Sequence, residues 1–165
     1  MAQLPPKYFG HSRGPVEDIR RYCKGGFHPI HIGDTLRGRF KVVDKLGHGR
    51  RATVWLCRDL QLEKWVAIKV LASFESAISC ADLMLPNHFR VPAPKPELEY
   101  FCFLLEHFWA TGPNGAHICI VLPLLGPSIA HATDYFFDQP FVLKSVCRQM
   151  ALAMHLLHSR NICHG

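Results

Sequence analysis

The stretch at residues 44–70, DKLGHGRRATVWLCRDLQLEKWVAIKV, places a short glycine-spaced turn among alternating apolar residues. Strand-favouring residues such as Val, Ile and Trp recur on both sides of this turn. The connections are short enough for antiparallel hairpins. The stretch therefore predicts three antiparallel strands, over residues 39–49, 51–59 and 64–72.

The glycine pair at the first turn is compatible with phosphate binding. Backbone N–H groups beside Gly47 and Gly49 could approach a phosphate without obstruction by a Cβ atom. Lys69, two strands further on, would supply a positive charge to the phosphate oxygens. A tight turn needs glycine for steric reasons alone, so only the combination of Gly47, Gly49, Val54 and Lys69 predicts a nucleotide site.

The composition is that of a folded protein with a basic front half. The chain has 165 residues, 48% of them hydrophobic and 19% charged, which excludes disorder along the whole length. The net charge of +6 is concentrated in the first 60 residues. This excess suits a phosphate-bearing ligand, an acidic protein or a nucleic acid, and a solvated basic face explains it equally well.

The cysteines and the N-terminal residues predict an intracellular protein. Seven cysteines, an odd number without a CxxC pair, are interpreted as small buried hydrophobic residues in a reducing compartment. The first residues show no secretory signal, and no apolar run is long enough to span a bilayer. We expect no membrane association.

The rest of the chain predicts four further features. Residues 22–34 should form an ordered extended arm, and the proline-rich stretch at 86–96 cannot be helix interior. Two apolar runs flank the GPNG turn at 112–115, which predicts a strand, a hairpin and a strand. Residues 140–159 predict an amphipathic helix whose apolar face would be exposed unless another element covers it. The histidines of this helix do not form a metal-site pattern, so we predict no metal site.

Several stretches together resemble the SR-protein kinase group, especially its fungal members. They are YCKGGFHPIHIGD, KLGHGRRATVWLCRD, VAIKV, GPNGAHICIVLPLLGPS and LHSRNICHG, within residues 20–71 and 99–165. The resemblance implies an α+β fold: a protein-kinase-like small lobe with an antiparallel sheet and a short or disrupted helix C, followed by the first helices of the large lobe. It divides the chain into a basic arm at 1–33, the small lobe at 34–122, and the hinge with the incomplete large lobe at 123–165.

The resemblance also implies an ATP site. In the family, this site consists of a phosphate loop with the roof of the adenine pocket, an alanine on the adenine, a phosphate-contacting lysine, a gatekeeper and a hinge. The phosphate loop and the roof match Leu46, Gly47, Gly49 and Val54. The alanine matches Ala67, the lysine matches Lys69 and the gatekeeper matches Leu122. The hinge matches Pro123, Leu124 and Leu125.

The lysine needs an acidic partner, and the sequence leaves its identity open. Glu97 and Glu99 are the nearest candidates to the family's helix C glutamate, and Glu75 is a weaker one. His164 and Gly165 match the two residues before the family's catalytic aspartate. We therefore expect a truncated chain without the general base and the Mg²⁺ ligands, and little turnover from this chain alone.

The function implied is that of the ATP-binding portion of a serine/threonine protein kinase. The intact family would transfer the γ-phosphate of ATP, with Mg²⁺, to serines of Arg/Ser-rich proteins in the cytoplasm or nucleus. The alternative is a non-catalytic nucleotide-binding or scaffold module. Nucleic-acid binding through the basic front half is the least favoured hypothesis.

Overall fold

The computed structural model describes residues 16–77, 82–84, 96–126, 128–129 and 139–163. The chain divides into two compact units. The first comprises Met1–Leu85 and Phe103–Leu125, and the second comprises Pro86–Cys102 and Gly126–Gly165. The domain boundaries expected from the sequence remain a prediction.

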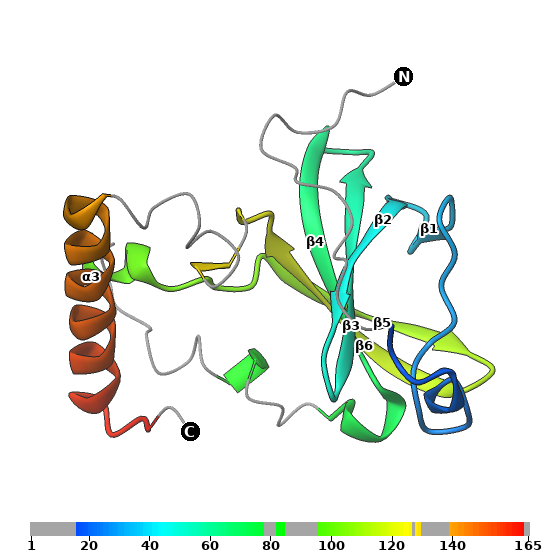
Figure 1. The fold of residues 1–165 in the computed structure, drawn as a ribbon. Helices are drawn as coiled ribbons and strands as arrows, with labels where there is room; N and C mark the ends of the chain where they lie inside the picture. The colour runs from blue at the N-terminus through cyan, green and yellow to red at the C-terminus, as the bar shows by residue number, and fades with distance from the viewer. Residues whose placement is uncertain (1–15, 78–81, 85–95, 127, 130–138, 164–165) are drawn as a thin grey trace. The chain divides into compact units, whose positions relative to one another are not determined.

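The first unit is built on a six-stranded antiparallel sheet (Figure 1). The strand order is β1-β2-β3-β4-β6-β5, which confirms the three predicted strands of the glycine-containing stretch and the later strand-hairpin-strand. The bounds are β1 Thr35–Leu36, β2 Phe40–His48, β3 Ala52–Asp59, β4 Lys64–Leu71, β5 Glu106–Gly112 and β6 Gly115–Pro123.

The sheet buries apolar residues on both faces, because neighbouring residues of a strand point to opposite sides. The main-core face is defined by Ile30, Leu36, Phe40, Val42, Trp55, Cys57, Val66, Ile68, Val70, Phe108, Cys119 and Val121. The opposite face of the sheet, here called the cavity face, carries a smaller cluster of Ala52, Leu71, Ile118 and Ile120, against which Leu83, Leu104 and Leu122 pack. Burial on both faces explains why β4 and β6 are almost continuously apolar.

The cysteines follow the sequence expectation only in part. Cys57 and Cys119 are buried in the main core, and burial raises the pKa of each thiol to about 12. The other four described cysteines are exposed, so for them the expectation of buried hydrophobic residues is wrong: Cys23, Cys102, Cys147 and Cys163. Composition alone could not separate the two groups.

The predicted N-terminal arm is ordered and packs on the sheet. Its described part, from residue 16 on, includes the short 3-10 helix η1, Ile19–Arg21, and Phe27, which is only 1% exposed. The Gly25 N–H donates to the Asn114 carbonyl at 2.7 Å, and the Asn114 side chain donates to the Phe27 carbonyl at 2.7 Å. The arm is therefore fixed to the β5–β6 hairpin.

Between β4 and β5 the structure describes three short helical pieces. They are the 3-10 helix η2 at Ser73–Glu75, a helical turn at residues 82–84, and the 3-10 helix η3 at Pro96–Tyr100. Short pieces of this kind agree with the short or disrupted helix C that the resemblance implies. The proline-rich stretch lies almost entirely outside the described residues.

The second unit contains α3, Pro140–His158, and η3 packs against it. Pro140 occupies the first turn, where its missing N–H is not needed, and the predicted helix is confirmed. Phe141, Met150 and Met154 are exposed. Among the described helices, none has the length and apolar character needed to cross a membrane.

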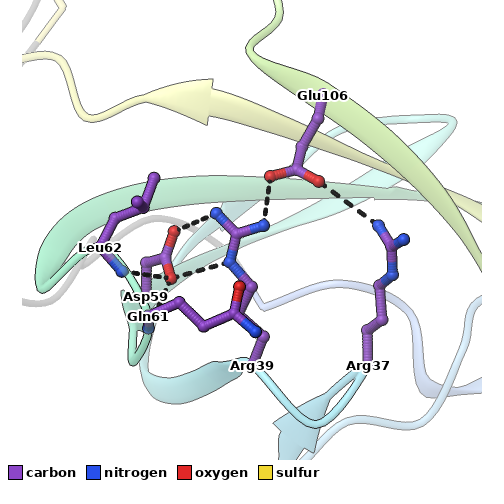
Figure 2. A network of polar contacts seen from close by, with 6 residues as sticks. All are labelled: Arg37, Arg39, Asp59, Gln61, Leu62 and Glu106. Atoms are coloured by element: carbon purple, nitrogen blue, oxygen red, sulfur yellow. Dashed lines mark hydrogen bonds and ion pairs between the residues drawn. The ribbon is translucent and has the colours of Figure 1, made fainter.

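A polar network ties the beginning of β2, the end of β3 and the beginning of β5 together (Figure 2). Arg39 donates to both oxygens of Asp59, at 2.8 and 2.6 Å, and to Glu106 at 2.8 Å. The Asp59 carboxylate also accepts from the Gln61 and Leu62 N–H groups of the β3–β4 turn. The hydrogen bonds from Arg39 lower the pKa of Asp59 to about 2, against the opposing effect of burial.

Replacing Asp59 with Asn should reduce the free energy of unfolding by roughly 2 kcal/mol at pH 7, because charge-assisted hydrogen bonds to Arg39 are lost. The native carboxylate stabilises the fold above its unfolded pKa, and this contribution disappears as the pH falls from about 4 to about 2. The difference between variant and wild type should therefore shrink over that range. Urea unfolding followed by circular dichroism measures the free energy of unfolding of both proteins at each pH.

The matched control is Glu63→Gln, which changes an exposed carboxylate of the same turn. We expect less than about 0.5 kcal/mol for this control. Equal unfolding curves for Asp59→Asn and wild type at pH 7 would contradict the role given to the network.

Candidate functional site

The strand register brings the predicted phosphate-contacting residues together. Gly47 of β2 pairs with Val54 of β3, and Val54 pairs with Lys69 of β4. Cross-strand partners project to the same face of a sheet, so Val54 and Lys69 share the cavity face with Ile120, the partner of Lys69 in β6. The glycine-rich hairpin and the lysine are thus neighbours in space, although 22 positions separate Gly47 from Lys69 in the chain.

A cavity of about 610 Å³ lies at this point of the sheet. Its described lining combines five predicted residues with four that the sequence reasoning missed. The predicted ones are Leu46, Gly47, Gly49, Val54 and Lys69, and the additional ones are His48, Arg50, Arg51 and Ala52.

The glycines leave the hairpin side of the cavity open. A Cβ atom built on Gly47 or Gly49 would meet no atom within 4 Å. Neither glycine is therefore required by close packing within the protein. Their effect is to leave the hairpin backbone uncovered toward the cavity, as phosphate binding through N–H groups requires.

The charged residues of the cavity wall favour an anion. Lys69, Arg50 and Arg51 are all basic, and Arg51 also contacts Glu75, with 3.4 Å between Nε and Oε1. The Lys69 side chain is 30% exposed. The wall thus offers one partly buried ammonium group and two guanidinium groups at the surface.

The Lys69 ammonium contacts Asp82. Its Nζ atom lies 2.9 Å from each carboxylate oxygen. Asp82 is placed by the helical turn at residues 82–84, whose Leu83 packs on the cavity-face cluster. Among the described residues of this turn, Leu83 is thus an apolar anchor beside the carboxylate.

The sequence reasoning did not consider Asp82 as the partner of the lysine. Of its candidates, Glu75 contacts Arg51, and Glu99 is an exposed residue of the second unit. The side chain of Glu97 lies outside the described residues. A signal was available, because Asp82 is the only acidic residue between Glu75 and Glu97.

The predicted adenine-pocket and hinge residues lie on β4 and β6 and directly after β6. Ala67 is buried and pairs with Leu122, which packs on the cavity-face cluster. Leu124 is half-buried, and Leu125 is 64% exposed. None of these four belongs to the described lining of the cavity.

No metal centre accompanies the cavity in the part of the chain that the structure describes. Within these residues, no three His, Cys, Asp or Glu side chains are grouped so that they could hold a metal ion.

Comparison with known proteins gives three informative relatives. The chain is 38% identical to human SRSF protein kinase 3 over 152 residues, 87% of this chain and 26% of that protein. It is 33% identical to a serine/threonine protein kinase of Aspergillus fumigatus, of which it covers 37%, and 32% identical to serine/threonine-protein kinase spk-1 of Caenorhabditis elegans, of which it covers 16%. No protein-family model matches. The chain thus spans between about one sixth and two fifths of the length of these relatives.

Asp82→Asn should increase the rate at which an acylating reagent labels Lys69, because a neutral amide holds the ammonium less strongly. A partly exposed ion pair contributes about 0.2–1 kcal/mol, which corresponds to about a 1.4-fold to fivefold change. Mass spectrometry of the labelled peptides measures the labelling rate. Lys64, exposed at the start of the same strand, should label equally in both proteins. Unchanged labelling of Lys69 would contradict the contact with Asp82.

Proposed function

We propose that this chain, a segment of the SR-protein kinase type, provides the phosphate-binding part of an ATP site in its first unit. The observation that carries the proposal is a cavity lined by both the glycine-rich hairpin and Lys69. The antiparallel sheet of a kinase-like small lobe supports it, since the register sets these groups side by side.

In this proposal each group of the cavity has a defined task. Backbone N–H groups around Gly47 and Gly49 approach the phosphates, and the Lys69 ammonium contacts phosphate oxygens. Asp82 takes the place of the glutamate that the sequence reasoning looked for at 97 or 99, and it holds the lysine while the site is empty of nucleotide. Leu46 and Val54 form the roof of the adenine pocket.

The remaining assignments of the adenine pocket rest on the resemblance. Ala67 and Leu122 are proposed to contact the adenine, and the backbone of residues 123–125 to act as the hinge. Their support in the structure is the pairing of Ala67 with Leu122 on the face that also carries Lys69.

We further propose that the intact protein transfers the γ-phosphate of ATP to serines of an Arg/Ser-rich protein, in the cytoplasm or nucleus. Mg²⁺ is expected for this chemistry. The described cavity wall, with two arginines and one lysine, does not fit Mg²⁺, so its ligands would be the nucleotide and residues other than these. We therefore assign no catalytic step to the metal.

Replacing Lys69 with Ala should weaken ATP binding about tenfold to a hundredfold, because a hydrogen bond between charged groups is worth about 1.5–3 kcal/mol. Isothermal titration calorimetry with MgATP measures the affinity. The control is Lys64→Ala, which removes an exposed lysine at the start of β4 and should bind ATP as the wild type does.

Equal affinity of Lys69→Ala and wild type would overturn the assignment of Lys69. An absence of measurable ATP binding to the wild-type chain would overturn the proposed function. Binding of ATP without phosphorylation of an Arg/Ser-rich peptide by the intact protein would favour the alternative, a non-catalytic nucleotide-binding module.

A further inference from the structure

We infer that residues 17–27, here called the brace, hold the glycine-rich hairpin at both of its ends and thereby set its position at the cavity. The functional consequence for nucleotide affinity rests on the proposed ATP site. The structural part of the inference, that the brace holds the hairpin in position, does not rest on that site. It depends on two contacts, one to Lys45 before Gly47 and one to Arg50 after Gly49.

The first contact fixes the strand that enters the hairpin. The Lys45 ammonium contacts the Glu17 carboxylate, and the Tyr22 hydroxyl donates to the same carboxylate at 2.6 Å. The Glu17 and Lys45 side chains are only 9% and 26% exposed. The Lys45 ammonium also lies 5.1 Å from the centre of the Trp55 ring, in the main core. Lys45 is thus held from two sides.

The ionisation of Glu17 agrees with this contact. Burial alone would raise the pKa of Glu17, but hydrogen bonds from Lys45 and Tyr22 outweigh it and lower the pKa to about 2. The carboxylate therefore stays charged at neutral and mildly acidic pH. The contact to Lys45 acts as a constant restraint rather than as a pH switch.

The second contact fixes the turn itself. The Arg21 guanidinium donates to the backbone carbonyl of Arg50, the residue that follows Gly49. The same guanidinium lies 4.4 Å from the centre of the Phe27 ring, which is buried. A backbone carbonyl moves with the hairpin, so this bond restrains the hairpin more directly than a contact between side chains would.

The brace can restrain the hairpin because the brace is itself anchored at its other end. The Phe27 N–H donates to the Arg21 carbonyl at 2.7 Å, and the Ser73 N–H donates to the Gly26 carbonyl at 2.9 Å. Glycine is favoured at both positions of this turn, for different reasons: Gly25 has φ +84°, which side chains disfavour, and a Cβ on Gly26 would lie 2.0 Å from the Arg21 carbonyl oxygen. The backbone path between Arg21 and Phe27 is therefore closely defined.

A restraint from outside matters here because a glycine-spaced hairpin has little rigidity of its own. Glycine has more conformational freedom than other residues, and a binding loop that is already ordered loses less entropy when the ligand binds. The cavity side of Gly47 and Gly49 is open. The described contacts that hold the hairpin from the other side include those of Glu17 and Arg21.

Hydrogen exchange of the full chain, followed by mass spectrometry of peptides covering residues 45–52, tests the brace. Glu17→Gln and Arg21→Ala should each accelerate exchange in these peptides by about threefold to tenfold, while peptides of β4 and β6 exchange as in wild type. The neighbouring residues provide matched controls. Asp18 and Arg20 are exposed and pair with each other at 2.7 Å, so Asp18→Asn and Arg20→Ala should leave the hairpin peptides unchanged.

A milder variant covers the case in which Glu17→Gln or Arg21→Ala unfolds the protein. Tyr22→Phe removes only the hydroxyl that donates to Glu17, and it should accelerate hairpin exchange by about twofold. Unchanged exchange in the hairpin peptides of all folded brace variants would overturn the inference. Equal acceleration throughout the sheet would also overturn it, because that result means a general loss of stability.

The affinity for MgATP then tests the functional consequence. In the brace variants it should fall about threefold to tenfold, and in the two control variants it should equal that of wild type. If the wild-type chain binds no ATP, the proposed function fails, and the exchange data still decide whether the brace exists. If hairpin exchange rises while affinity stays the same, the brace does not set the hairpin for the nucleotide.

Discussion

The cross-strand pair between Val54 and Lys69 determines which side of the sheet the lysine occupies. Eight consecutive pairs join β3 to β4, and a slip of one residue would turn Lys69 to the main-core face, beside the positions of Ile68 and Val70. Burying an ammonium group there without a partner would cost several kcal/mol. The Asp59 carboxylate, which accepts the N–H groups of the β3–β4 turn, fixes this register from the far end of both strands.

Two lysine–carboxylate pairs flank the glycine-rich hairpin, and their exposure separates their roles. Lys69 and Asp82 are 30% and 37% exposed, so their pair is worth about 1 kcal/mol or less. A triphosphate can replace or share such a partner at little cost. The Glu17 carboxylate is 9% exposed, and separating it from Lys45 would leave a buried charge unpaired. The Lys69 ammonium is therefore suited to exchanging its partner, and the Glu17–Lys45 pair is suited to holding the structure.

More of the fold than of the candidate site could be predicted from the sequence. Alternation of apolar residues predicts β2, runs of strand-favouring residues predict β3 and β4, and the three- and four-residue spacing predicts α3, because these patterns are local. The contact between Arg21 and Arg50 joins residues 29 positions apart, and no local pattern specifies it. Asp82 was missed for a similar reason, since its contact with Lys69 joins residues 13 positions apart.

Lys69 itself illustrates how a strand pattern can single out a candidate functional residue. The interior of β4 is apolar apart from this lysine, and both faces of the strand are covered. The buried polar residue of the neighbouring strand β6, His117, has a structural explanation, because its Nδ1 atom lies 2.9 Å from the Leu71 carbonyl oxygen. Lys69 differs from His117 in that its charged end faces a cavity. An apolar side chain at position 69 would extend the cavity-face cluster, so the packing of the sheet alone does not require a lysine there.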